Sequence, residues 1–461
     1  AVAVDGLVTP SLDELNADLQ LNLNQLSVRQ AQAHLALNEL SFNGSSFIHL
    51  SAESAQRPSS IIGDIRLSTL AFNSPDVKAK FRTLASSVDL SQDLNSAVIT
   101  GDLNLDDLDV DITGQQLRIG KLYLAPNLTT PAGLSSFNPS QLAGSVDLEL
   151  STLNLNSQAT SLSLQGLELN NRLTPKASGQ NLVSRLIMRD IGLSDAQQEV
   201  GVSMLSANIV TELDSQLRAS QLDLTHSTVT QLQYTPKPKG ESVSVAGINL
   251  ERLSAVSQGS TAVFDTYDAK GFAVDKLLVG PADTPTASLD SLLLDGVSFS
   301  DNYLKIGQLI TSNLKANIQT RLNATPDIKD KTNTATGAAG SASPEVVSSE
   351  EPKAMAQNTN SNVDKRLPID ISFDSWLAQG RTELNYRDAS LAAPLNLNFV
   401  ATEIRAAAWD SRTASPLSIK LKGHLNESTD IDIDARITPL KTKPDGDWTI
   451  SVNALPLPSL S

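Results

Sequence analysis

Residues 103–110 read Leu-Asn-Leu-Asp-Asp-Leu-Asp-Val, and residues 117–124 read Leu-Arg-Ile-Gly-Lys-Leu-Tyr-Leu. Both stretches follow the pattern apolar-x-apolar-x-x-apolar-x-apolar. Within each apolar pair the alternation places both side chains on one face of a β-strand. The two-residue gap would reverse that face on a regular strand. We therefore expect a bulge or a bend at the gap, which returns the second pair to the first face.

The pattern occurs ten times, and copies sometimes follow each other after 14 residues, as from 103 to 117. That length suits a strand, a short reversal and a returning strand. The sequence predicts an all-β, elongated fold of mostly antiparallel strands in repeated meander or hairpin units, with few short helices. The occurrences begin at Leu21, Leu35, Ile65, Leu103, Leu117, Leu148, Leu162, Leu186, Val243 and Leu292.

Composition narrows the class of protein. Apolar residues make up 40% of the chain but aromatics only 4%, so the buried side chains are mainly aliphatic. The net charge of −16 repels phosphate backbones, which argues against a nucleic-acid partner and against adsorption to an anionic bilayer. The absence of cysteine excludes zinc clusters, disulfides and thiol catalysis, and it fits an oxidising compartment such as a bacterial periplasm.

Three regions differ in composition. Residues 1–323 carry the repeated strand pattern, whereas residues 324–366 contain almost nothing to bury and predict a flexible low-complexity linker or loop. Residues 367–461 resume the strand pattern as a second β-module. The chain lacks an initiator Met and closes on a Leu-Pro-Leu-Pro stretch, so we expect that this second module is truncated and that the chain is a piece of a longer protein.

No constellation for catalysis or for a cofactor is evident, and we predict that the protein is not an enzyme. Metalloprotease, nucleophile-elbow, phosphate-loop and dinucleotide motifs are all missing, and no metal site is predicted. The four histidines are isolated in sequence and are interpreted as structural or surface residues: His34, His49, His226 and His424.

Two acidic runs and the tryptophans leave alternatives open. Asp107, Asp109 and Asp111 alternate with apolar residues, as do Asp430, Asp432 and Asp434. A solvated strand face explains both runs, although stacked carboxylates are also calcium ligands. The three tryptophans all lie in the second module, where we expect them in the core: Trp376, Trp409 and Trp448.

The apolar face has two interpretations. It is either the core of a sandwich, covered by an opposite layer, or an open groove for lipid acyl chains. Burial of a methylene group is worth about 0.8 kcal/mol, so a strip of aliphatic side chains would bind a lipid tail. The candidate groove residues are Leu103, Leu105, Leu117, Ile119, Leu148, Leu150, Leu162 and Leu164.

The segment after residue 366 resembles the AsmA-like superfamily of Gram-negative envelope proteins, in the branch that is known as a large domain of unknown function. The resemblance rests on Leu367-Pro-Ile-Asp-Ile-Ser-Phe373 and on Gly380-Arg-Thr-Glu-Leu-Asn-Tyr-Arg-Asp388-Ala-Ser-Leu-Ala-Ala-Pro394. The resemblance continues over residues 417–425, 431–440 and 452–460. Over residues 12–323 only the general style of the sequence, with its repeated apolar strands, is similar.

This resemblance implies a periplasmic protein of the cell envelope that is tethered to the inner membrane through a segment outside this chain. It also implies a long β-sheet curled around an apolar groove, which passes phospholipid between the inner and outer membranes or maintains the outer membrane. Phospholipid acyl chains are the expected partner, and partner proteins are not specified. The alternative is a structural or interaction β-scaffold of the periplasm without lipid cargo.

Overall fold

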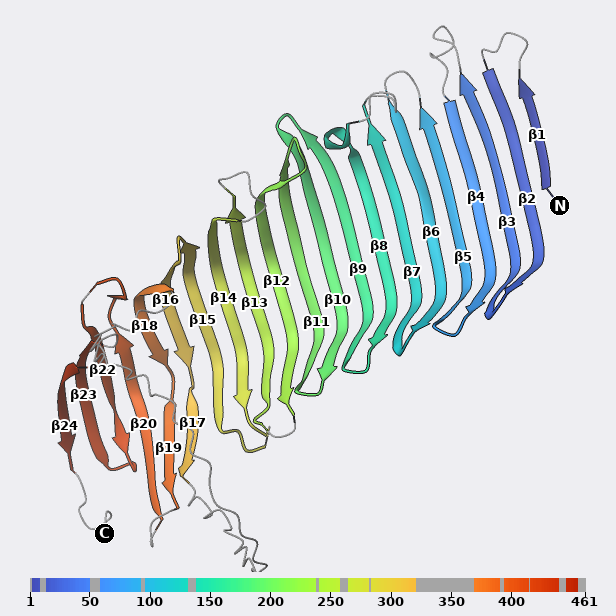
Figure 1. Ribbon diagram of the computed structural model, residues 1–461. Helices are drawn as coiled ribbons and strands as arrows, with labels where there is room; N and C mark the ends of the chain where they lie inside the picture. The colour runs from blue at the N-terminus through green and yellow to red at the C-terminus, as the bar shows by residue number, and fades with distance from the viewer. Residues whose placement is uncertain are drawn as a thin grey trace, which may run out of the picture.

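The computed structural model describes most of the chain (Figure 1). The residues that it describes are 2–8, 14–49, 59–92, 96–131, 138–237, 240–257, 264–281, 283–320, 369–389, 394–413, 415–438 and 445–454. Most of them belong to β-strands, and all 24 strands join one sheet. The predicted all-β class and the elongated antiparallel meander are therefore confirmed. In the described residues the only helix is a single 3-10 turn, η2 (Pro139–Gln141).

The first fifteen strands follow each other along the sheet in chain order, each antiparallel to the next. They are β1 (Val2–Val8), β2 (Glu14–Gln30), β3 (Ala33–His49), β4 (Ser59–Asn73), β5 (Val77–Gln92), β6 (Ala97–Ile112), β7 (Gln115–Thr130), β8 (Ala143–Asn156), β9 (Thr160–Lys176), β10 (Gly179–Asp195), β11 (Gln198–Asp214), β12 (Ala219–Pro236), β13 (Val243–Val256), β14 (Thr266–Val279) and β15 (Ala287–Ser300).

Tight two-residue turns join neighbouring strands at both ends of the sheet. Between β6 and β7, Thr113 and Gly114 have φ of 47° and 84°, and between β15 and β16 (Tyr303–Ser312), Asp301 and Asn302 have φ of 49° and 60°. Two successive left-handed residues form the hairpin turn whose twist matches that of the flanking strands. Such turns fix the register of each hairpin, and hence which side chains share a face.

The predicted mid-strand change of direction is present, and it is a bend without an inserted residue. In the 103–110 pattern, Asp107 has φ of 53°, yet Asp106 and Leu108 keep one-to-one partners on β7. The bulge alternative is therefore wrong here. Six of the ten patterns have a left-handed residue at the second gap position: Gln25, Thr69, Asp107, Thr152, Asp190 and Gly296. Figure 1 shows that the long strands change direction along their length.

A second line of bends begins at β12. This strand has two left-handed residues, His226 and Gln231, with φ of 49° and 52°, and β14 has Gly271 and Lys276, with φ of 63° and 50°. Each pair divides its strand into three segments, whereas β2 or β6 is divided into two. Strands such as β2 and β6 therefore consist of two straight segments, whereas β12 and β14, nearer the C-terminus, consist of three.

The last strands join the same sheet through a parallel contact. β16 pairs in parallel with β18 (Asp370–Gln379), and β17 (Lys315–Thr320) pairs in parallel with β19 (Thr382–Asp388). The remaining strands are antiparallel: β20 (Leu395–Ala406), β21 (Trp409–Asp410), β22 (Leu417–Leu425), β23 (Thr429–Thr438) and β24 (Asp445–Asn453). The predicted linker 324–366 lies outside the described residues, and the division into 1–323 and 367–461 stays a prediction.

In the sequence, Thr9-Pro10-Ser11 and Ser74-Pro75-Asp76 each allow a short helix to begin, and the second can be assessed. Residues after Ser74-Pro75-Asp76 form strand β5, and Ser74 receives a hydrogen bond from the Val77 amide at 3.1 Å on its hydroxyl oxygen. The alternation of Val77, Ala79 and Phe81 therefore belongs to a strand. Residues 9–13, where the other helix was considered, lie outside the described residues.

Candidate functional site

Register places the apolar side chains in rows that cross the sheet. Residues that are direct cross-strand partners share a face. Leu103 of β6 pairs with Leu124 of β7, which pairs with Leu148 of β8 and then Leu169 of β9. The second row is Leu105, Leu122, Leu150 and Leu167, the third Leu108, Ile119, Leu153 and Leu164, and the fourth Val110, Leu117, Leu155 and Leu162. We call the face with these rows the inner face.

The eight residues singled out from sequence all fall in these rows. Two lie in each row, so the structure brings them together on the inner face over β6–β9. Leu164 is buried at 6% exposure, and the other seven are half-buried. The first and second rows lie on one side of the bend, and the third and fourth on the other. Leu105 and Leu108 are half-buried, and the gap residue Asp107 between the two pairs is exposed.

The rows continue across the parallel contact to the last strand. Leu294 of β15 pairs with Leu309 of β16, which pairs with Trp376 of β18. The row then runs through Ala406, Ile419 and Ala435 to Trp448 of β24. The inner face is therefore one apolar surface from β2 to β24, bent lengthwise. We call this trough the gutter.

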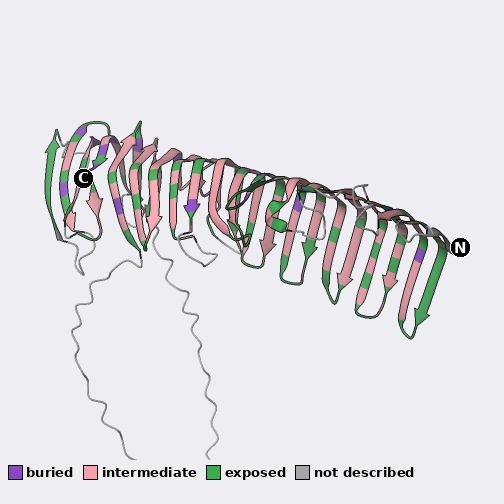
Figure 2. Cartoon of the chain, turned by 90° about the horizontal axis from the view of Figure 1, so that it is seen from above, coloured by how far each residue is buried: buried purple, intermediate pink, exposed green. Residues whose placement is uncertain are grey.

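All described strands belong to one sheet, and no second sheet of described residues packs on the gutter. Figure 2 shows most strand residues as half-buried or exposed, with few buried ones. On the inner face Val28, Leu155 and Leu26 have exposures of 48%, 42% and 39%. A sandwich core would bury such side chains almost completely.

Charged side chains lie on the opposite, outer face or at the bends. Lys80, Asp109 and Arg118 form a chain of ion pairs across β5, β6 and β7, with N–O distances of 3.5 and 3.4 Å to the Asp109 carboxylate. Asp107 pairs with Arg82 at 3.1 Å. Within the described strands only Asp195 and Asp388, both at strand ends, have inner-face register.

The second acidic run has the same place on the sheet. His424 Nδ1 lies 2.7 Å from the Asp430 carboxylate and Lys422 Nζ lies 3.7 Å from that of Asp432, while Asp434 faces Lys420 across the strands. Each acidic residue of this run on β23 therefore faces a basic one on β22. No group of three or more potential metal-binding side chains occurs in the described part of the chain.

Sequence reasoning missed a polar spot inside the gutter. Ser184 Oγ donates to Asn171 Oδ1 at 2.6 Å, and both residues have inner-face register between β9 and β10. Nearby, the buried Gln180 side-chain amide donates to the Leu142 carbonyl at 2.6 Å, next to η2. These polar groups satisfy each other. Asn171 and Ser184 lie outside the apolar pattern, and only the register reveals them.

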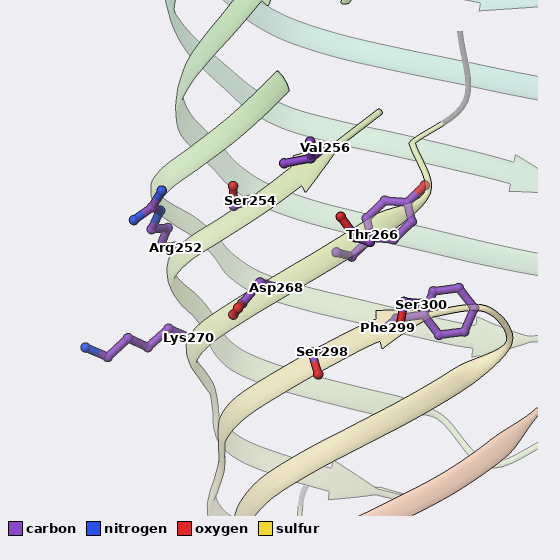
Figure 3. Close-up of a pocket in the computed structure, with 10 residues that line it drawn as sticks. Arg252, Ser254, Val256, Thr266, Asp268, Lys270, Ser298, Phe299 and Ser300 are labelled. Atoms are coloured by element: carbon purple, nitrogen blue, oxygen red, sulfur yellow. The ribbon is translucent and has the colours of Figure 1, made fainter. Parts of the chain in front are cut away.

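A hollow of about 530 Å³ lies on the outer face over β13, β14 and β15 (Figure 3). Ser254, Asp268 and Ser298 share one row there, and the Arg252 and Lys270 side chains project to the same side in Figure 3. Arg252 bonds to Asp223 at 2.9 Å. Burial alone raises the pKa of Asp223, but hydrogen bonds from Arg252, Ser254 and Gln221 bring it below its usual range.

The tryptophans occupy different environments. Trp376 and Trp409 are half-buried, whereas Trp448 is 58% exposed, so the expectation that all three lie in the core is wrong for Trp448. The reason is its place on β24, which pairs only with β23 among the described residues. No described strand lies beside β24 on the edge that faces away from β23.

No family model, no curated protein and no solved structure matches this chain. Among the described residues, no helix combines the length and apolar character needed to cross a bilayer.

Proposed function

We propose that this chain is a cell-envelope protein whose gutter binds phospholipid acyl chains and conducts them along the sheet between the inner and outer membranes of a Gram-negative bacterium. The proposal includes a periplasmic location and no catalytic role. The resemblance of residues 367–461 to the AsmA-like superfamily supports the location in the cell envelope. The geometry of the inner face supports the binding of phospholipid acyl chains.

The observation that carries the proposal is the continuation of the aliphatic rows along the inner face. Aliphatic rows follow the sheet through β6–β9 and on to β24, and most of their side chains are half-buried, with Leu164, Ile404 and Ala406 among the buried ones. Neighbouring strands lie about 4.8 Å apart, so a sheet of this many strands extends on the order of 100 Å. An acyl chain that gains about 0.8 kcal/mol for each buried methylene can move between equivalent rows without losing its contacts.

The distribution of charge supports the same function. The two faces differ sharply: the outer face carries the ion pairs of Asp109 and Asp432, while the gutter offers a lipid headgroup no charge inside β6–β9. A buried unpaired phosphate would be costly in such a trough. The acyl chains therefore enter the gutter, and the headgroup stays at its open side in water.

Site-specific photocrosslinking tests the proposal. A benzophenone side chain at Leu148 or Leu164, in protein extracted gently from membranes, is expected to crosslink to phospholipid. The matched control is Glu149, exposed on the outer face between Leu148 and Leu150. Equal labelling at Leu148 and Glu149, or no labelling at either position, would contradict a lipid-filled gutter and favour a periplasmic scaffold without cargo.

Conduction, as distinct from binding, needs a second experiment. Leu148→Asp with Leu150→Asp would place two carboxylates across two neighbouring rows on β8. We expect this variant to bind lipid elsewhere along the sheet, yet to fail to restore outer-membrane integrity in cells that lack the gene. Glu149→Gln is the control and is expected to restore it fully. Full rescue by the double variant would show that no lipid passes this point.

A further inference from the structure

Asn171 places a side-chain amide on the inner face of β9, among aliphatic neighbours. Its direct cross-strand partners are Val146 of β8 and Ser184 of β10. Leu169 and Leu173 flank it on the same face of its own strand. Asn171 is half-buried, and Ser184 is buried at 6% exposure. A hydrogen-bonding group is therefore embedded in the apolar floor of the gutter.

Two hydrogen bonds fix the orientation of this amide. Its Oδ1 accepts a bond from the Ser184 hydroxyl at 2.6 Å, and its Nδ2 donates to the Val146 carbonyl at 3.3 Å. Because a carbonyl can only accept, the nitrogen end of the amide must face β8 and the oxygen end must face β10. The amide is held from both neighbouring strands, so no reorientation is needed when a ligand binds.

One donor of the Asn171 amide is left over. The NH2 group of an asparagine has two hydrogens. Val146 accepts from one of them, and among the described residues no acceptor bonds to the other. A polar group that loses water without gaining a partner is destabilising. When acyl chains fill the gutter and displace water, an acceptor on the lipid itself would remove this penalty.

The surroundings favour an uncharged acceptor. Within the described strands β8–β11, no Lys or Arg has inner-face register, so a phosphate would find no counter-charge there. An ester carbonyl is uncharged and accepts hydrogen bonds. It is also the group that joins each acyl chain of a diacyl phospholipid to its glycerol, so it enters the trough together with the chain.

The distance along β9 agrees with the length of an acyl chain. Asn171 lies six positions from Gln165 at the bend, which is about 20 Å at the usual rise of a strand. The hydrocarbon core of a bilayer is about 30 Å thick, so one acyl chain extends about 15 Å. A chain whose ester carbonyl meets Asn171 can therefore lie over Leu169 and Leu167 and end before the bend.

We propose that Asn171 is an ester-binding residue of the gutter, whose spare amide hydrogen donates to an ester carbonyl of a diacyl glycerophospholipid while the acyl chain lies along β9 toward the bend. Ser184 is a positioning residue that holds the amide oxygen. The inference rests on the proposed function, since it names the lipid class and the place of one lipid in the same trough. Its consequence is selectivity for lipids that carry a carbonyl.

A choice between two matched lipids tests the proposal. The purified chain is equilibrated in detergent micelles with equal amounts of diacyl phosphatidylethanolamine and its dialkyl ether analogue. The two share the headgroup and chain length, but the ether lacks the carbonyl oxygens. Mass spectrometry of the retained lipid is expected to show the ester in excess by about two- to tenfold, the effect of one hydrogen bond.

A double variant assigns this preference to the polar pair. Asn171→Leu with Ser184→Ala removes both partners, so neither is left unpaired in the trough. We expect this variant to retain as much lipid in total, with ester and ether in equal amounts. The matched control is Asn170→Leu at the adjacent exposed residue, whose amide donates to Asp147 at 3.0 Å on the outer face. It should keep the natural preference, and circular dichroism should show the same β content in both variants.

The outcomes separate this inference from the proposed function. Equal retention of the two lipids by the natural chain would overturn the ester-binding role of Asn171 and leave acyl-chain binding in place. A preference that persists in the double variant would overturn it too, because the donor would then lie elsewhere. Retention of neither lipid would overturn both the ester-binding role and the lipid-binding gutter.

Discussion

The guanidinium carbon of Arg412 lies 3.5 Å from the centre of the Tyr303 ring. The same guanidinium bonds to the Asp410 carboxylate at 2.8 Å, and the Tyr303 hydroxyl donates to that carboxylate at 3.3 Å. The Tyr303 hydroxyl also lies 2.5 Å from the Ser372 hydroxyl. This cluster joins β16, β18 and β21, where the sheet passes from antiparallel to parallel pairing.

Removal of the guanidinium should loosen this parallel contact. We expect Arg412→Ala to lower the stability of the β16–β18 pair, because the contact with the ring and a charge-assisted hydrogen bond are both lost. Hydrogen exchange of the β18 amides is the measurement, and β6 amides serve as the internal reference. Equal acceleration in β6 would indicate global unfolding instead of a local role.

The cluster also predicts a local acid sensitivity. Hydrogen bonding from Arg412 is the main cause that lowers the pKa of Asp410 below its usual value. A carboxyl group whose pKa is lower in the folded state stabilises the fold fully above its unfolded pKa of about 3.9, and this contribution is lost as the pH falls through the folded pKa. We expect β18 protection to fall below about pH 4, and to fall less in Asp410→Asn. An identical acid profile in Asp410→Asn would exclude this carboxyl.

The bend residue Thr152 is a β-branched residue with φ of 55°, a region that such side chains rarely adopt. A left-handed conformation costs a residue other than glycine roughly 1–2 kcal/mol, and the greater unfolded-state entropy of glycine offsets about 0.4–1 kcal/mol of the relief. Thr152→Gly is therefore expected to be neutral or slightly stabilising in thermal denaturation. The control is Ser151→Gly, which changes the adjacent strand residue without a positive φ and should be destabilising. A larger loss of stability in Thr152→Gly than in Ser151→Gly would show that the bend is not strained.

Close packing of the backbone predicts different outcomes at two glycines. A Cβ at Gly101 would lie 2.3 Å from the Ser87 carbonyl oxygen, whereas a Cβ at Gly201 would meet nothing within 4 Å. We expect Gly101→Ala to destabilise the β5–β6 pair. Gly201→Ala should be neutral or stabilising by up to about 1 kcal/mol, because alanine loses less backbone entropy. Thermal denaturation of both variants checks this, and similar effects of the two would contradict the register of β5 and β6.

Two leucines of the gutter should differ in their contribution to stability. Leu164 is 6% exposed, and Leu155 on the neighbouring strand is 42% exposed. Leu164→Ala is expected to cost about 2–5 kcal/mol, the usual range for a buried leucine, and Leu155→Ala much less. Urea unfolding of each variant, followed by a probe on β9, measures the two losses of stability. If Leu155→Ala costs as much as Leu164→Ala, a layer outside the described residues covers the gutter.

Much of the fold could be predicted because its pattern is local. A period of two assigns the face of each strand, and the gap at Asp106-Asp107 indicates where the face must be restored. The second line of bends, marked by His226 and Gln231, was not predicted, because no repeated residue type marks it. The polar pair Asn171 and Ser184 could not be found either, since residues in register on different strands have no fixed spacing in sequence.

The sequence by itself determined that the chain forms strands and which side chains share a face, because both follow from spacings of two or three residues. The candidate gutter residues, Leu103 to Leu164, were placed on one face for that reason. Only the tertiary structure decided that this face stays open among the described residues, because coverage depends on where distant strands pack. It also decided that β16 and β18 pair in parallel, because this pairing depends on contacts between residues far apart in the chain.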